Sequence, residues 1–276
     1  MIAAAPAKPQ PVPVAAARPY AQVEDVAADA LAGLQPVVVV NRRTDTAIRQ
    51  VDGAADRPFP TLHSDARGDV MTRLRRVTRG VNERLRGTYG DGNTVYGSVR
   101  FVPQADVSRG ADAVVAALRA QGDTGVRAYG SVSFIADPSK VDSRTTYAPD
   151  DSGSTGVWVR DRSKLPTVVA ERLYRSDGAG ASPRPDELLR LPRQAARDAV
   201  RGWLLSDDLA RSDGYIEAQV RRVAPSDVLA AVLDLRDISN VPRRTLIDPG
   251  EAPAGEARAA LEQHLDRLGV PTYHVQ

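Results

Sequence analysis

Four consecutive valines, Val37 to Val40, form the strongest strand signal in the chain. β-Branched residues favour strands, and a strand without polar residues is expected to be buried on both faces. The chain is therefore expected to fold around a sheet that is covered on both sides. The strand runs directly into Asn41, Arg42 and Arg43. This arrangement either presents polar groups in a cleft or marks the exit of the strand into solvent.

Helices and strands are mixed through the rest of the chain. Apolar residues at helical spacing predict helices, and alternation with period two predicts strands. The pattern favours a mixed α+β fold in which the strands need not be parallel. The predicted helices cover residues 20–34, 66–86, 111–120, 192–205 and 254–268, and the predicted strands cover 95–102, 129–135, 144–147, 157–159, 215–220 and 273–275. Ser226 is a suitable N-cap for a short helix at 227–231, and the apolar run 228–235 is expected to finish as a strand.

Proline sets the first 20 residues apart from the rest of the chain. Its density there opposes helix and sheet and favours an extended arm of polyproline II type. Such an arm is either disordered or becomes ordered against a partner, as in virion and assembly proteins. No break in composition divides the remainder, so residues 21–276 are expected to form a single α+β domain.

The composition excludes several kinds of site. The chain has no cysteine, which excludes disulfides, thiolate nucleophiles and cysteine-ligated metals. The histidines, His63, His264 and His274, are far apart in sequence, so we expect no metal site and see little support for a histidine-based triad. No apolar run approaches the ~20 residues that span a bilayer, and the N-terminus does not resemble a secretory signal. No membrane partner is therefore expected, and the cytoplasm is the expected location.

Positive charge is carried almost entirely by arginine, although the net charge is only +2. Arginines are dense in the predicted helix 66–86, with few acids between them. This face is either simply solvated or binds phosphate groups of a dinucleotide or a nucleic acid. Since no aromatic residues lie between the arginines, base stacking is not indicated.

One predicted strand carries an unusual pair of polar residues. In the segment Tyr215–Val220, alternation places Tyr215, Glu217 and Gln219 on one face and three apolar residues on the other. Burying a carboxylate and a carboxamide is unfavourable unless both have partners. The segment is therefore either an edge strand with a solvated face or the strand that carries the chemistry.

Two other strands share a motif. Residues 96–101 and 129–134 both read Tyr-Gly-Ser-Val-x-Phe, and a predicted helix separates them. Two copies with different flanks are too few for a repeat array. We interpret them as two related strands of one sheet.

Two segments resemble a known family. Residues 129–152 read YGSVSFIADPSKVDSRTTYAPDDS, and residues 215–235 read YIEAQVRRVAPSDVLAAVLDL. Together they resemble the ADP-ribosyltransferase-like domains of bacteriophage head-associated proteins and bacterial toxins. The resemblance implies a mixed, mostly antiparallel β-core with peripheral helices, which splits to hold NAD. In that superfamily an Arg or His lies on the first strand, a Ser- or Tyr-bearing strand is central and a Glu lies on a late strand. Here the same order is formed by 37–43, 129–134 and Glu217.

The resemblance implies roles for individual residues. Glu217 would stabilise the oxocarbenium-like centre that forms when the nicotinamide–ribose bond of NAD breaks. Arg42 would pair with a phosphate of NAD. Ser131 and Ser133 would hold the nicotinamide ribose or brace the glutamate, and Gln219 would be a secondary neighbour of the glutamate.

The chain departs from the family pattern at several positions. Asn41 and Arg43 are alternatives to Arg42 at the first-strand position. Val132 replaces the threonine of the usual Ser-Thr-Ser sequence. Tyr215 stands where the family often has a second acid, two residues before the glutamate. The resemblance therefore does not specify the acceptor of ADP-ribose.

Three functions are compatible with these observations. The first is an NAD-dependent ADP-ribosyltransferase or NAD glycohydrolase, acting as a toxin or phage-associated effector on a protein or nucleic-acid acceptor. The second is a non-catalytic virion or assembly component that docks through residues 1–20 and is located in the virion if the chain is of phage origin. The third is a nucleic-acid-associated module that uses the arginines of 66–86.

Overall fold

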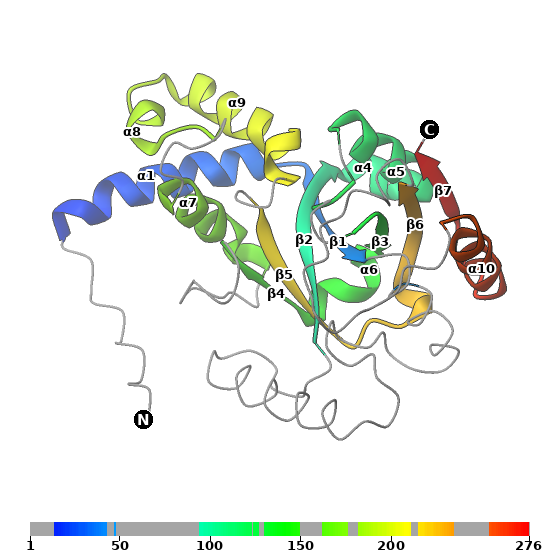
Figure 1. Ribbon diagram of the computed structural model, residues 1–276. Helices are drawn as coiled ribbons and strands as arrows, with labels where there is room; N and C mark the ends of the chain where they lie inside the picture. The colour runs from blue at the N-terminus through cyan, green and yellow to red at the C-terminus, as the bar shows by residue number, and fades with distance from the viewer. Residues whose placement is uncertain are drawn as a thin grey trace, which may run out of the picture.

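The computed structural model describes residues 14–42, 47, 94–122, 124–126, 130–149, 162–175, 182–210, 215–234 and 254–275. Its strands are β1 (Leu34–Arg42), β2 (Thr94–Pro103), β3 (Val132–Ala136), β4 (Thr145–Ala148), β5 (Ile216–Arg221), β6 (Val228–Asp234) and β7 (Thr272–Val275). They form one seven-stranded sheet in the order β4-β5-β2-β1-β3-β6-β7, with helices around it (Figure 1).

The central strand β1 is the one predicted from the four valines. All of its residues are buried, which confirms the expectation that both of its faces are covered. It pairs antiparallel with β2 from Leu34 to Val39 and antiparallel with β3 from Val39 to Arg42. Among the described strands, only β6 and β7 pair in parallel. The protein is therefore α+β with a mostly antiparallel sheet.

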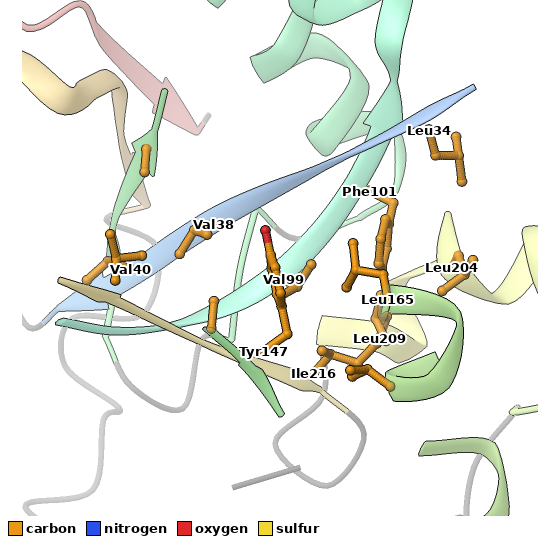
Figure 2. Packing of buried hydrophobic residues seen from close by; sticks show 14 of the residues in the cluster. Leu34, Val38, Val40, Val99, Phe101, Tyr147, Leu165, Leu204, Leu209 and Ile216 are labelled. Carbon is orange, nitrogen blue, oxygen red and sulfur yellow. The ribbon is translucent and has the colours of Figure 1, made fainter. Parts of the chain in front are cut away.

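Helices cover both faces of this sheet. On one face the main core joins apolar residues of β1–β6 to α1 (Val14–Leu31), α7 (Leu165–Arg175), α9 (Arg193–Leu204) and α10 (Ala254–Arg267). Figure 2 shows part of this core, where Leu165 and Leu204 gather near Phe101 of β2. On the other face, α4 (Gln104–Arg109) and α5 (Ala111–Ala120) cover a smaller apolar cluster. Of the described helices, none is long and apolar enough to cross a membrane.

The remaining helices of the described ranges are short and connect the larger elements. They are α6 (Pro138–Val141), α8 (Pro185–Leu188) and the 3-10 helices η2 (Asp142–Arg144), η3 (Arg162–Lys164), η4 (Asp207–Ala210) and η5 (Pro225–Asp227).

Most predicted elements within the described residues are confirmed. The helix predicted at 111–120 has the bounds of α5. The helix predicted at 254–268 is α10, and Gly269 follows it with a φ of 67°, the left-handed conformation typical of a residue after a helix. The strand predicted at 273–275 is β7, at the edge of the sheet.

Two expectations are corrected by the structure. The helix predicted at 227–231 is wrong, because β6 begins at Val228 and pairs with β3, so strand pairing overrides the local helix signal. Residues 14–20 were expected to be part of an extended arm, but they belong to α1, which begins at Val14 and includes Pro19. Residues 1–13, the predicted helix 66–86 and the predicted strand 157–159 lie outside the described residues.

The turn after β5 is strained and clamped. Arg222 has a φ of 56°, in the left-handed region that is unfavourable for a non-glycine residue by about 1–2 kcal/mol. Arg144 holds this turn, because its Nη1 donates to the carbonyl oxygen of Arg222 at 2.7 Å and its Nη2 lies 2.7 Å from Oδ2 of Asp227. The same carboxylate oxygen accepts a hydrogen bond from the backbone N of Ala224 at 2.7 Å. These contacts fix the direction in which the chain leaves β5.

Replacing Arg222 by glycine is expected to stabilise the protein. Glycine adopts a positive φ without steric cost, and the exposed Arg222 side chain makes no contribution to the core. We expect the free energy of unfolding to rise by about 0.5–1 kcal/mol in urea denaturation. The matched variant Arg221→Gly, in the strand itself, should lower it by a similar amount. A loss of stability in Arg222→Gly would contradict the strain at this turn.

The edge strand β7 is tied to α5 by two side chains. The Tyr273 hydroxyl donates to Oδ1 of Asp112 at 2.6 Å, and Nη2 of Arg119 donates to the carbonyl oxygen of His274 at 2.5 Å. Partial burial, together with the hydrogen bond to Asp112, raises the pKa of Tyr273 to about 12. The last strand is therefore attached to the sheet by side chains as well as by the β6–β7 ladder.

This raised pKa predicts a pH dependence. The folded chain holds the phenolic proton of Tyr273 more tightly than the unfolded chain, so the resulting stabilisation is present below pH ~10 and is lost as the pH rises towards 12. The variant Asp112→Asn should lower the pKa of Tyr273 in a spectrophotometric tyrosine titration. An unchanged titration curve would show that Asp112 does not influence this phenol.

Candidate active site on the polar half of the sheet

The two faces of the sheet differ in polarity. The face under α1, α7 and α9 is lined by apolar side chains of β1–β6. Apart from Ala148 of β4, the opposite face is apolar where α5 packs, and the residues of this smaller cluster on β1, β2, β3 and β6 are Val37, Val39, Val102, Ile135, Ala230 and Val232.

The rest of this second face is polar and mostly buried. We define the polar face as the following side chains, which strand alternation and register place on that side: Asn41, Thr94, Tyr96, Ser98, Arg100, Ser133, Thr146, Glu217 and Gln219. Tyr96 is half-buried, and the others are at most 5% exposed. Since buried polar groups are unfavourable unless they are paired, such a concentration requires a specific arrangement.

Glu217, on β5, is the acidic member of the polar face. It is 4% exposed, and its Oε1 accepts a hydrogen bond from Nε2 of Gln219 at 2.8 Å. Directly opposite it on β2 is Ser98, whose hydroxyl lies 3.4 Å from the carbonyl oxygen of Val39. The carboxylate is thus desolvated and oriented by an amide, with a hydroxyl on the neighbouring strand.

Arg100 adds a positive charge to the same face. It lies two residues along β2 from Ser98, so it is a diagonal neighbour of Glu217. Diagonal neighbours are about 7–8 Å apart, which a long side chain can span. The guanidinium is fully buried, and its Nη2 donates to Oε1 of Gln121 at 3.1 Å and to the carbonyl oxygen of Ser206 at 3.2 Å. A buried cation on the same face as a buried carboxylate reduces the net charge that this face buries.

A second group of polar residues lies at the end of β1. Nδ2 of Asn41 donates to Oγ of Ser133 at 2.9 Å and to the carbonyl oxygen of Gly130 at 3.2 Å. The Thr124 hydroxyl donates to the same Ser133 oxygen at 3.0 Å. Ser133 therefore ties β1, β3 and the segment after α5 together.

The structure brings some of the predicted site residues together. Glu217 and Gln219 are hydrogen-bonded neighbours, as the strand pattern suggested. Ser133 lies on the same face but on β3, three strands from β5, which is about 14 Å at the usual strand spacing. Ser131 is half-buried just before β3, and its carbonyl oxygen accepts a hydrogen bond from the backbone N of Asp234 at 2.8 Å. Neither serine is therefore a neighbour of the carboxylate.

Arg42 lies on the opposite face of the sheet from Glu217. Alternation along β1 places its side chain with Val38 and Val40, in the main core. It lines a small, otherwise apolar cavity of ≈ 10 Å³ with Val40, Val95, Phe134, Ala136, Val223 and Val228. Its Nη1 donates to the carbonyl oxygen of Asn41 at 2.7 Å. The first-strand residue that shares a face with Glu217 is Asn41, and Arg43 lies outside the described residues.

Ser98 and Arg100 belong to the site although sequence reasoning did not select them. A signal for Ser98 is present, because the motif Tyr-Gly-Ser-Val-x-Phe occurs on both β2 and β3. The order of the segments along the chain favours the copy at 129–134, whereas the sheet pairs β5 with the copy at 96–101. The serine beside the glutamate is therefore Ser98.

No family model, curated protein or solved structure matches the chain. Within the residues that the structure describes, no group of three His, Asp or Glu side chains is arranged to hold a metal ion.

A close backbone contact at the polar face gives a test of this packing. A Cβ atom added at Gly125 would lie 2.2 Å from Oδ1 of Asn41 and 2.7 Å from Cγ1 of Val39. We expect Gly125→Ala to lower the free energy of unfolding by about 1–3 kcal/mol, because Asn41 must leave its hydrogen bonds to make room. Urea denaturation measures this loss.

Gly202 provides the matched control for this variant. It lies in α9, where an added Cβ would meet nothing within 4 Å. Gly202→Ala should raise the free energy of unfolding by about 0.5–1 kcal/mol through helix propensity. Equal effects of the two substitutions would contradict the close packing of Gly125 on Asn41.

Proposed function

We propose that the protein is an NAD-consuming enzyme of the ADP-ribosyltransferase type, with Glu217 as its catalytic carboxylate. The observation that carries the proposal is the environment of Glu217. It is a buried carboxylate that accepts a hydrogen bond from Gln219 and faces Ser98 across two paired strands. The resemblance of residues 129–152 and 215–235 to ADP-ribosyltransferase-like domains supports the same assignment.

The chemistry follows from this environment. Cleavage of the nicotinamide–ribose bond builds positive charge at the ribose carbon, as in glycoside hydrolysis. A fixed carboxylate in a water-poor site stabilises that charge more strongly than a solvated one does. Gln219 holds one oxygen of Glu217 by a hydrogen bond, so the carboxylate is oriented before the charge develops. The reaction then transfers ADP-ribose to water or to an acceptor group.

The polar face is suited to the ribose end of NAD. Ribose hydroxyls are hydrogen-bond donors, and the Glu217 carboxylate and Ser98 hydroxyl are acceptors on neighbouring strands. In this proposal Ser98 takes the role that the family resemblance implies for Ser131 and Ser133. Ser133 instead accepts hydrogen bonds from Asn41 and Thr124 and supports the architecture.

The phosphate end of NAD requires a different residue from the one expected. Arg42 lies on the far side of the sheet from Glu217 and lines an apolar cavity there. It does not fit a role in binding a phosphate of the same NAD molecule. Arg100 is the buried cation on the face of Glu217, and we assign it to charge compensation at the carboxylate because Gln121 and Ser206 already bind its Nη2.

Replacing Glu217 by glutamine tests the proposed function. Glutamine keeps the shape of the side chain and an oxygen for Gln219, but removes the negative charge that stabilises the reacting centre. We expect NAD affinity, measured by calorimetry, to change little and nicotinamide release, measured by chromatography, to fall by about 10²–10³-fold.

The exposed Glu187 of α8 supplies the matched control. Glu187→Gln carries the same chemical change and should release nicotinamide at the wild-type rate. Absence of NAD binding in the wild-type protein would overturn the proposed function. Wild-type turnover in Glu217→Gln would remove Glu217 from the catalytic role.

A further inference from the structure

Three buried polar atoms of the polar face lack hydrogen-bond partners in the described part of the chain. They are Oγ1 of Thr94, Oγ1 of Thr146 and Oε1 of Gln219. All three residues are fully buried, at 0% exposure. Among the described residues, none offers these atoms a hydrogen bond.

The three atoms belong to one patch on three neighbouring strands. Thr146 of β4 is directly opposite Gln219 of β5, so their Cβ atoms are about 4.5–5.5 Å apart. On the other side of Gln219, β2 places Tyr96 opposite it and Thr94 two residues away on the same face. Gln219 thus lies on the strand between the two threonines, directly opposite Thr146 and diagonal to Thr94.

The orientation of the Gln219 amide is set by Glu217. An ionised carboxylate only accepts hydrogen bonds, so the NH₂ group of Gln219 must face Glu217 and donate to it at 2.8 Å. A flipped amide would place two acceptor oxygens against each other. Oε1 of Gln219 is therefore held away from Glu217 as an acceptor without a donor.

Leaving these groups unsatisfied is unfavourable for folding. Valine has nearly the shape of threonine and would remove a hydroxyl that is buried without a partner. Groups kept in this condition are typical of functional sites, where a ligand supplies the missing hydrogen bonds. The patch offers one obligatory acceptor and two hydroxyls that each donate or accept.

We propose that Thr94, Thr146 and Gln219 form a subsite for a carboxamide, and that its occupant is the carboxamide of the nicotinamide group of NAD. This inference rests on the proposed function. A carboxamide supplies N–H donors for Gln219 Oε1 and one threonine, and a carbonyl oxygen that accepts from the other threonine. The subsite is one hydrogen bond from Glu217, which agrees with the short separation of the carboxamide from the bond that breaks.

The charges of the polar face favour a neutral group in this subsite. Arg100, a diagonal neighbour of Glu217, already places a positive charge on this face, so a cation gains little there. A carboxylate has no donor for Gln219 Oε1 and would lie near the negative charge of Glu217. The subsite should therefore discriminate a carboxamide from a carboxylic acid.

The test compares NAD with its analogue nicotinic acid adenine dinucleotide, which carries a carboxylate in place of the carboxamide. Calorimetry on the full chain should give an affinity for NAD at least about tenfold higher than for the analogue. In Thr146→Val this preference should shrink to about threefold or less, while the melting temperature stays the same or rises because a buried unsatisfied hydroxyl is lost.

Thr145 supplies the matched control, since it precedes Thr146 but faces the main core. Its hydroxyl donates to the carbonyl oxygen of Val141 at 2.8 Å. Thr145→Val should therefore lower the melting temperature and keep the preference for NAD. The two adjacent substitutions are thus expected to have opposite effects on stability and on discrimination.

The outcomes separate this inference from the proposed function. NAD binding without preference over the analogue overturns the carboxamide subsite and leaves the role of Glu217 intact. An undiminished preference in Thr146→Val, with a fall in melting temperature, also overturns it, because the hydroxyl then has a structural role. Failure of wild-type protein to bind NAD overturns both.

Discussion

The fold depends on one strand that is buried on both faces and that changes its principal partner along its length. β1 pairs with β2 up to Val39 and with β3 from Val39 onward. Ladder pairing therefore continues along the whole strand, first with one neighbour and then with the other. It also leaves the first half of β2 paired with β5, so that Tyr96 and Ser98 meet Gln219 and Glu217. The polar face is thus a consequence of how the central strand is hydrogen-bonded.

Local signals in the sequence were sufficient for much of the fold but not for the site. The valine run, α5 and the face of Glu217 and Gln219 depend on spacing within one segment, and the structure has them as expected. α7 is absent from the predicted helices, although Leu165, Val168 and Leu173 have helical spacing. The face that Arg42 occupies and the choice between the two serine strands depend on sheet order, which is a non-local property. Two copies of one motif cannot be told apart before the pairing of β5 is known.

The polar face has the properties of a functional site, but burying its polar and charged groups lowers the stability of the fold. A uniformly apolar second face would pack against helices as the first one does, and it would contain no buried charges. The protein instead buries Glu217 and Arg100 as diagonal neighbours, and hydroxyl and amide groups on β4, β5 and β2 have no hydrogen-bond partner among the described residues. The net free energy of unfolding of a protein is only about 5–15 kcal/mol. The cost of burying such groups is therefore large compared with the net stability of the fold. The large apolar cluster on the opposite face is the part of the structure that compensates for them.

The two edges of the sheet influence how the protein behaves at high concentration. At one edge, all residues of β4 are buried. At the other edge, β7 is short and half-exposed, and Arg119 from α5 donates a hydrogen bond to the carbonyl oxygen of His274. A strand from a second molecule would have to break that hydrogen bond and accommodate a guanidinium beside its own backbone. Arg119 therefore opposes the pairing of β7 with an edge strand of another molecule, and replacing Arg119 would favour aggregation through this edge.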